Sequence, residues 1–529
     1  MPDEEAVLYP IIYVRGFAMT RTEIDETTAD PFCGFNIGST VFRATPDREK
    51  PPRKYIFESP LVRLCTDFGY ADVYNDGKDI TDDDWTGSIS KKSVVIYRYY
   101  DPASSLLGSG KTPPMEDFAK GLSKLILRVR ELVCQDPKNA TTPNKFRCYL
   151  VAHSMGGLVC RAFLQNRALG DDVARKCVDK VFTFATPHNG IEMAGINVPS
   201  WVGAGDANNF NRKRMAEYLD LKQEYAKTDR VDWLRVRDGV PPAERFFCLI
   251  GTNRSDYEVA AGLSRTFAGN GSDGLVRIEN ARVSDIKDGQ PSTSAAKAFV
   301  YRSHSGYFGI VNSEESYQNL VRFLFGDIRA DIWLDIDNIS LPDKVQTEQD
   351  AGHEIDALYQ FEVLASPRGK LWYLTRRTSE EDSVACLSHK DWMKSRGAKP
   401  VSLYVSSIFL AKRARVNTDR PSLAYSMSLG VRVPDYEVER KLWVNEHFEG
   451  AYLFRDAVVI EIVPPQNDDG DWQITYDWQS AKVGVATTPL KPNSLQDGKL
   501  ELLVPFASET APGIKGKLRF VVSKWNLGG

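Results

Sequence analysis

A serine flanked by small residues stands where an apolar run of the sequence gives way to a helical pattern. The segment reads Ala152-His153-Ser154-Met155-Gly156. It matches G-x-S-x-G with alanine in the first place, the spacing of a nucleophile elbow, in which serine occupies a strained turn between a strand and a helix. Such a turn exposes the Ser154 hydroxyl at the carboxyl edge of a sheet and directs the Met155 N–H toward an oxyanion. A serine that only caps a helix is the alternative interpretation.

A serine hydroxyl needs a base to become nucleophilic at neutral pH, and histidine is the usual one. The chain has six histidines: His153, His188, His304, His353, His389 and His447. We predict His304 as the base, because it follows the last buried strand and precedes a closing helix. We expect His188, in the segment TPHNG, and His153, whose ring should point away from the nucleophile, to support the site.

The acid that orients the base should follow a buried strand and precede His304 in the chain. Asp273 lies in the polar segment SDGLV after the apolar run 246–250. We predict it as the acid, with Asp256 and Asp285 as alternatives. A simple turn aspartate before glycine is the competing interpretation.

The second oxyanion donor should come from the loop after the first buried strand. That loop reads Val14-Arg15-Gly16-Phe17. Gly16 permits a close approach of the backbone, so we predict that the Phe17 N–H donates to the oxyanion together with Met155. An ordinary turn glycine is the alternative.

Apolar runs alternate with helical patterns through the first two thirds of the chain, which favours a parallel sheet. The expected strands are residues 11–14, 93–99, 146–152, 181–185, 246–250 and 298–301. Helices are expected from residue 118, from residue 155 and over residues 313–325, the last capped by Asn312 with Glu315 completing a capping box. Two long segments interrupt this order: a polar insertion over residues 18–91 and a cap over residues 191–244.

After about residue 331 the apolar residues alternate with polar ones, for example at Ile332, Leu334 and Ile336. Many strands of this kind with turn-rich connections predict an antiparallel β-sandwich. We therefore expect two domains, residues 1–330 and 331–529. Core packing is the expected role of Trp472 and Trp478.

Composition sets limits on function and location. A net charge of −4 over 529 residues offers no basis for binding nucleic acid. The start MPDEEAVLYP lacks a basic region followed by an apolar core, so we predict a cytoplasmic protein, with a secreted form whose signal has been removed as the alternative. Eight cysteines without a CxxC pair do not indicate a disulfide framework. The run Asp82-Asp83-Asp84 lacks alternating ligand spacing, so no metal site is expected.

The chain resembles bacterial and eukaryotic lipases of the α/β-hydrolase superfamily. The matching segments are YVRGF, AHSMGG, ATPHNG, SDGLV and HSGYF, which follow in order over roughly residues 9–326. Arg15 stands where these lipases usually have histidine. The resemblance implies an α/β-hydrolase fold, a mostly parallel sheet flanked by helices, followed here by the all-β, sandwich-like domain to which it does not extend.

The resemblance also implies the activity of a carboxylic ester hydrolase, a lipase or esterase, acting through an acyl-serine intermediate without a cofactor. It implies a lid within residues 191–244. A phospholipase or an acyltransferase would use the same triad, and a non-catalytic lipid- or partner-binding protein is the alternative of another class. The expected partner is an ester or lipid substrate, with peripheral contact to a lipid surface through the lid or the C-terminal domain.

Overall fold

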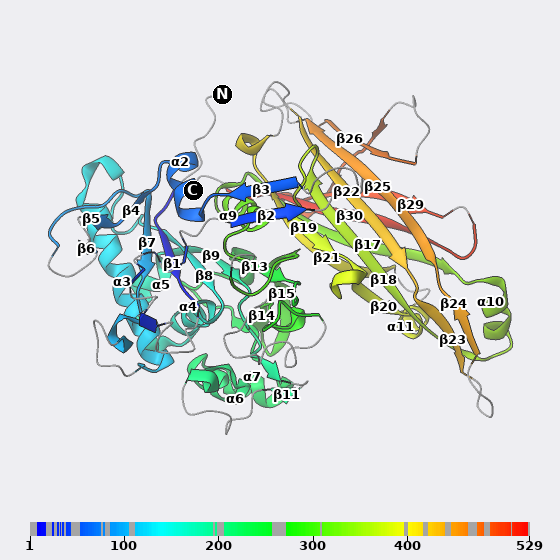
Figure 1. Ribbon diagram of the computed structural model, residues 1–529, viewed down its shortest axis with the longest axis horizontal. Helices are drawn as coiled ribbons and strands as arrows, with labels where there is room; N and C mark the ends of the chain where they lie inside the picture. The colour runs from blue at the N-terminus through cyan, green and yellow to red at the C-terminus, as the bar shows by residue number, and fades with distance from the viewer. Residues whose placement is uncertain are drawn as a thin grey trace. The chain divides into compact units, whose positions relative to one another are not determined.

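The computed structural model describes two compact units, one of residues 1–297 and 301–324 and one of residues 298–300 and 325–529 (Figure 1). The described residues are 8–16, 24–25, 29–30, 32, 34–35, 39–43, 53–75, 78–79, 85–104, 112–193, 196–197, 206–256, 271–306, 309–395, 400–415, 422–439, 446–463, 473–480, 487–508 and 510–526.

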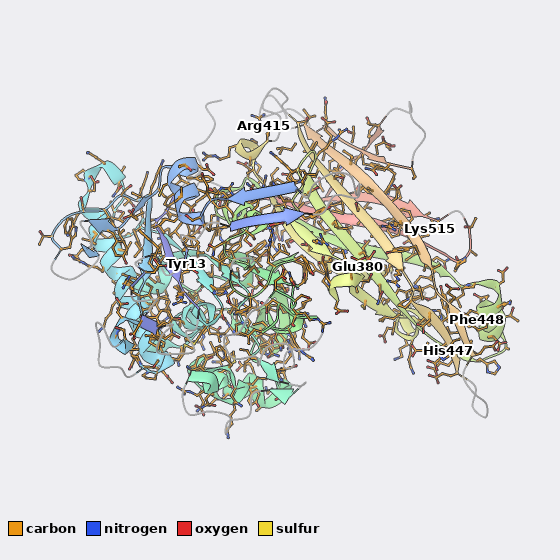
Figure 2. The ribbon with its side chains drawn as sticks, viewed as in Figure 1. Tyr13, Glu380, Arg415, His447, Phe448 and Lys515 are labelled. Atoms are coloured by element: carbon orange, nitrogen blue, oxygen red, sulfur yellow. The ribbon has the colours of Figure 1, made fainter. Side chains whose placement is uncertain are left out.

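A seven-stranded sheet forms the centre of the first unit, in the order β16-β13-β9-β8-β1-β7-β4. Its strands are β1 (Ile11–Val14), β4 (Ala71–Asp72), β7 (Ser93–Tyr97), β8 (Cys148–His153), β9 (Val178–Phe184), β13 (Phe246–Gly251) and β16 (Ala296–Val300). The strands from β13 to β4 in this order run parallel. The continuous apolar runs suit strands that are covered on both faces, and Tyr13 on β1 (Figure 2) is buried against the Phe35 ring.

The parallel register brings the carboxyl ends of β1, β8 and β9 to one edge. Val14 pairs with Ala152, and His153 pairs with Phe184. Ser154, which follows β8, therefore lies at the edge of the sheet where parallel α/β folds place their ligands.

Helices flank this sheet (Figure 1). They are α2 (Pro60–Phe68), α3 (Met115–Gln135), α4 (Met155–Gln165), α5 (Asp172–Lys176) and α9 (Glu314–Phe325). The expected cap of the last helix was wrong. The Ser313 hydroxyl, not Asn312, accepts the Ser316 N–H at 3.3 Å, and Glu315 pairs with Arg302 at 2.8 Å instead of closing a capping box.

The two long segments contain regular structure. In the first lie the hairpin of β2 (Ser39–Arg43) and β3 (Arg53–Phe57), helix α2 and strand β4. Because β4 extends the main sheet beside β7, this segment is only partly an insertion. The second holds short strands and helices: β10 (Glu192–Met193), β11 (Ile196–Asn197), α6 (Arg212–Tyr218), α7 (Lys222–Thr228) and β12 (Trp233–Arg235). Strand β12 pairs with β14 (Ser284–Lys287), and β14 in turn pairs antiparallel with β15 (Gln290–Ser294).

The second unit consists of antiparallel sheets, as the period-two pattern predicted. One has the order β21-β17-β30-β29-β28, and the larger contains the path β24-β23-β18-β22-β25-β26-β27 with β19 and β20 paired to β18. The strands are β17 (Ile328–Ser340), β18 (Glu354–Pro367), β19 (Thr375–Arg377), β20 (Ala385–Ser388), β21 (Val401–Leu410), β22 (Leu423–Arg432), β23 (Asp435–Glu439), β24 (Glu446–Glu449), β25 (Tyr452–Val463), β26 (Gln473–Trp478), β27 (Thr488–Pro489), β28 (Asn493–Ser494), β29 (Leu500–Ala507) and β30 (Gly513–Lys524), with helices α10 (Asp343–Asp350) and α11 (His389–Ser395).

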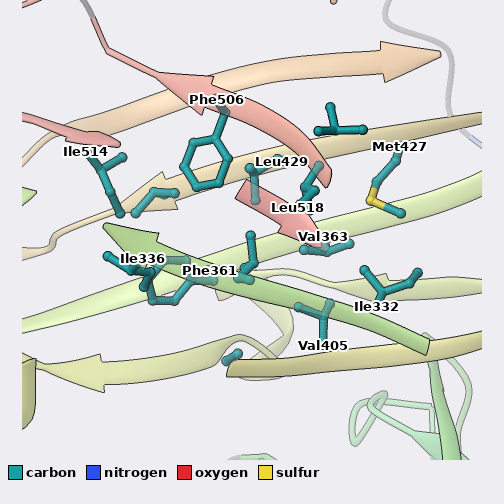
Figure 3. Close-up of a cluster of buried hydrophobic side chains, with 14 of the residues drawn as sticks. Ile332, Ile336, Phe361, Val363, Val405, Met427, Leu429, Phe506, Ile514 and Leu518 are labelled. Atoms are coloured by element: carbon teal, nitrogen blue, oxygen red, sulfur yellow. The ribbon is translucent and has the colours of Figure 1, made fainter. Parts of the chain in front are cut away.

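Inward side chains of both sheets form one apolar core. Ile332 and Leu518 from the first sheet pack with Phe361 and Leu429 from the second (Figure 3). Trp478 packs against this core and its indole N–H donates to the Pro505 carbonyl at 3.0 Å, whereas Trp472 lies outside the described residues. This is the layered arrangement of a β-sandwich.

Candidate active site

Ser154 occupies the sharp turn between β8 and α4. Its φ is 50° and its ψ is −123°, a conformation that costs free energy for any residue with a β-carbon. Two backbone hydrogen bonds hold it: the Ser154 N–H donates to the Phe184 carbonyl at 2.9 Å, and the Gly157 N–H donates to the Ser154 carbonyl at 3.1 Å. Strain of this kind, held by the surrounding sheet, is typical of functional sites.

The turn requires glycine on its helical side. A β-carbon on Gly156 would lie 2.2 Å from the Val14 carbonyl oxygen and 2.5 Å from that of Arg15. A β-carbon on Gly157 would lie 2.2 Å from the Thr186 hydroxyl oxygen. Ala152, by contrast, sits within β8 and is fully buried, so its methyl group is accommodated where the motif usually has glycine.

The structure brings Ser154, His304 and Asp273 together. His304 Nε2 lies 2.8 Å from Ser154 Oγ, and His304 Nδ1 lies 2.9 Å from Asp273 Oδ2. All three side chains are buried, with exposed fractions of 2% for Ser154, 3% for His304 and 1% for Asp273. A hydroxyl, an imidazole and a carboxylate in this order can transfer the hydroxyl proton to the imidazole while the carboxylate orients the ring.

Asp273 is fixed on both of its carboxylate oxygens. Oδ1 accepts the backbone N–H groups of Leu275 at 3.0 Å and Val276 at 2.7 Å, which leaves Oδ2 for His304. The His304 N–H also donates to the Asp273 carbonyl at 3.0 Å, so the acid and base loops are joined through the backbone.

The alternative aspartates have other partners. Asp256 Oδ2 accepts from the Asn253 amide at 2.6 Å. Asp285 Oδ1 accepts the Ala243 N–H at 3.0 Å, and burial raises the pKa of this carboxyl to about 6. Neither contacts His304 in the part of the chain that the structure describes.

His188 lies in the loop after β9 and is fully buried. The Thr183 hydroxyl donates its hydrogen to the Phe247 carbonyl at 3.2 Å. His188 Nε2 lies 3.2 Å from the same hydroxyl oxygen, so Nε2 carries a hydrogen and donates it to Thr183. Burial, and then the nearby Arg161 guanidinium, lower the pKa of His188 well below its usual value. His188 is therefore a neutral residue that packs this loop.

Sequence reasoning missed Arg161, which lies in α4 and is 0% exposed. Its guanidinium donates to the carbonyl oxygens of His188 at 2.9 Å, Val231 at 2.7 Å and Trp233 at 2.9 Å. It ties the loop after β9 to strand β12. The signal was an arginine within the apolar helical run LVCRAF, where a charge is expensive unless it is fully hydrogen-bonded.

The loop after β1 approaches the nucleophile closely. A β-carbon on Gly16 would lie 2.8 Å from His153 Nδ1 and 3.0 Å from the Ser154 β-carbon. Tyr99, which sequence reasoning also missed, donates its hydroxyl to this loop, at 2.7 Å from the Arg15 carbonyl and 3.1 Å from that of Gly16. Met155 is the buried first residue of α4, and Phe17 lies outside the described residues.

The remaining histidines lie in the second unit. His389 contacts the Tyr359 hydroxyl at 2.6 Å, His353 lies 3.7 Å from the Glu348 carboxylate, and His447 is exposed on β24 (Figure 2). Within the described ranges no group of three or more His, Cys, Asp or Glu side chains is arranged to hold a metal ion, and Asp82–Asp84 lie outside them. No helix among the described residues is long and apolar enough to cross a membrane.

A family described as "PGAP1-like alpha/beta domain" matches residues 109–195, which contain α3, β8, the Ser154 turn and β9. Together with the parallel sheet, this match decides the fold. The first unit has the α/β-hydrolase fold. No curated protein matches this chain in sequence.

Solved structures similar to this chain include two forms of the Bacillus licheniformis lipase BlEst2. The mature form is 14% identical with a TM-score of 0.30, over 61% of this chain and 96% of that chain. The propeptide form is 11% identical with a TM-score of 0.28, over 89% and 96%. A Listeria innocua protein is 12% identical with a TM-score of 0.27, over 60% and 94%.

Proposed function

We propose that this hydrolase cleaves carboxylic esters, as a lipase or esterase, with Ser154 as nucleophile, His304 as base and Asp273 as acid. One observation carries the proposal: the two hydrogen bonds that join the Ser154 hydroxyl, the His304 ring and the Asp273 carboxylate, at 2.8 Å and 2.9 Å, on a strained strand-to-helix turn. A serine that only caps a helix has no need of a buried imidazole and carboxylate behind it.

In the acylation step His304 Nε2 takes the Ser154 proton as Oγ attacks the ester carbonyl. Asp273 Oδ2 accepts from Nδ1–H, which holds the lone pair of Nε2 toward Ser154 and stabilises the imidazolium that forms. The imidazolium then gives its proton to the leaving alcohol, and an acyl-serine remains.

In the deacylation step water replaces the alcohol. His304 takes a proton from the water, the resulting hydroxide equivalent attacks the acyl carbon, and the proton returns to Ser154 Oγ as the carboxylic acid leaves. The Met155 N–H at the start of α4, together with the Phe17 N–H, is proposed to donate to the oxyanion in both steps. Each such donor is typically worth about 3 kcal/mol of transition-state stabilisation.

A fluorophosphonate probe tests the proposal, because it phosphonylates only a serine activated by a base. We expect a single adduct on Ser154, and we expect the Ser154→Ala variant to lose both the adduct and hydrolysis of a p-nitrophenyl ester. Ser88→Ala, which removes an exposed hydroxyl of the same unit, is the matched control and should keep both. An adduct on another serine, or full activity of Ser154→Ala, would overturn the mechanism.

Acyl transfer to an alcohol and hydrolysis of phospholipids use the same three side chains. Analysis of the products formed from the trapped acyl-enzyme separates transfer from hydrolysis. Binding of the whole chain to phospholipid vesicles tests contact with a lipid surface.

A further inference from the structure

His153 precedes the nucleophile at the end of β8, and its ring contacts the base loop. His153 Nε2 lies 2.8 Å from the His304 carbonyl oxygen, and the two imidazole rings are 5.0 Å apart between centroids. The ring thus faces the loop that carries His304. On its other side Nδ1 faces Gly16, where an added β-carbon would lie 2.8 Å away. One ring thus touches both the loop that carries His304 and the loop that follows β1.

The His153 ring is neutral and in one tautomer. Burial, then the nearby His304 and Arg15 side chains, lower its pKa to about 3, although the hydrogen bond to the His304 carbonyl acts in the opposite direction. A carbonyl oxygen only accepts hydrogen bonds, so Nε2 carries the hydrogen and donates it to the His304 carbonyl. The neutral ring gives a directed hydrogen bond without placing a charge beside the imidazolium that His304 becomes during the reaction.

The position of the His304 main chain determines where its imidazole ring lies. The His304 main chain is held at two points: its N–H donates to the Asp273 carbonyl at 3.0 Å, and its carbonyl accepts from His153. Its side chain must then reach Ser154 and Asp273 at the same time. A shift of about 1 Å in a reacting group can cost roughly a hundred-fold in rate.

We propose that His153 is a positioning residue for the base: its Nε2–H holds the His304 carbonyl so that the His304 ring stays aligned with Ser154 through both proton transfers. The inference rests on the proposed function. His153 touches no substrate and acts only through His304. Because His153 ends β8 and Ser154 follows it directly, this strand end holds both the base loop and the nucleophile.

Two substitutions separate this role from core packing. His153→Phe keeps an aromatic ring but has no donor, whereas His153→Gln supplies an amide N–H in place of Nε2–H. We expect the Phe variant to lose about ten- to a hundred-fold in kcat with little change in KM, since alignment rather than substrate binding is lost. We expect the Gln variant to remain close to wild type in kcat.

The low-field proton NMR signal of His304 Nδ1–H gives a readout that packing alone would not change. It should weaken or shift in His153→Phe and persist in His153→Gln. If the Phe variant fails to fold, His153→Asn, whose amide is one methylene shorter, replaces it as the variant without a donor in reach. Equal kcat and equal signals in the donor and donor-free variants would overturn the positioning role.

The wild-type chain is first labelled with the fluorophosphonate. If no adduct forms on Ser154, the proposed function is wrong, and this result does not depend on any change to His153. With the adduct present, the comparison of the Phe and Gln variants tests the positioning role alone.

Discussion

Gly156 faces the Val14 carbonyl oxygen so closely that a β-carbon on Gly156 would lie 2.2 Å from it. The second contact, 2.5 Å to the Arg15 carbonyl oxygen, is also with backbone, so no side-chain rotation can relieve it. Strand β1 and helix α4 are thus in contact at a position that only glycine fits.

Gly156→Ala should therefore push β1 and α4 apart and disturb the Ser154 turn. We expect the free energy of unfolding to fall by about 2 kcal/mol, in the range of overpacked cores, and kcat to fall with it. Urea unfolding and ester hydrolysis measure the two effects. Ala152→Gly at the other side of the turn is the control, expected to cost less than about 1 kcal/mol. Similar losses of unfolding free energy in both variants would contradict a requirement for glycine at position 156 alone.

Asp273→Asn should retain the fold and lose most of the activity. An asparagine amide in the place of Oδ2 would donate to His304 Nδ1 and hold the ring in the wrong tautomer, and we expect kcat to drop by roughly three to four orders of magnitude. Steady-state hydrolysis of a p-nitrophenyl ester measures it. Asp256→Asn, at the exposed alternative, should leave kcat unchanged. A larger loss in the Asp256 variant would reassign the acid.

The stability of the first unit should decrease with rising pH because of Asp285. Burial raises the pKa of this carboxyl from 3.8 to about 6, so between these values the folded chain holds a proton that the unfolded chain has released. The contribution of Asp285 is thus present below about pH 4 and is lost as the pH rises toward 6.

Asp285→Asn removes this titration and keeps an oxygen for the Ala243 N–H. Relative to the variant, the wild type should lose on the order of 1 kcal/mol between pH 4 and pH 6, allowing for partial solvent screening. Urea unfolding at several pH values measures the difference. A difference that stays constant with pH would show that Asp285 titrates normally.

Arg161→Met should destabilise the first unit strongly. The buried carbonyl oxygens of His188 and Val231 and the side-chain oxygen of Gln165 would lose this donor, whereas the Trp233 carbonyl would keep the Gln165 amide. We expect the free energy of unfolding to fall by about 3 kcal/mol, since each unsatisfied buried group costs about 1 kcal/mol or more. Arg130→Met, which removes a single exposed hydrogen bond to the Pro143 carbonyl, is the matched control and should cost much less. A small loss in Arg161→Met would mean that water replaces the guanidinium.

Local sequence was a good guide to the regular elements. The buried strands were expected within a few residues of where β1, β7, β8, β9, β13 and β16 lie, because runs of apolar residues must be covered. Its errors were also local in origin. Asn312 and Ser313 are both residue types that cap helices well, and α9 begins directly after Ser313. Strand β4 has two exposed residues and no apolar pattern, so it was absorbed into an expected insertion.

The sequence by itself determined the α/β-hydrolase fold of the first unit, the β-sandwich character of the second and the position of the Ser154 turn. Each depends on periodicity or on neighbours within a few residues. Only the tertiary structure decided which side chains meet. The contacts of His304 with Asp273 and Ser154 join residues 31 and 150 positions apart, and no local pattern encodes such a distance. The contacts of His153 with the base loop and of Arg161 with three carbonyl oxygens arise in the same way, from packing between elements that the chain brings together only when it folds.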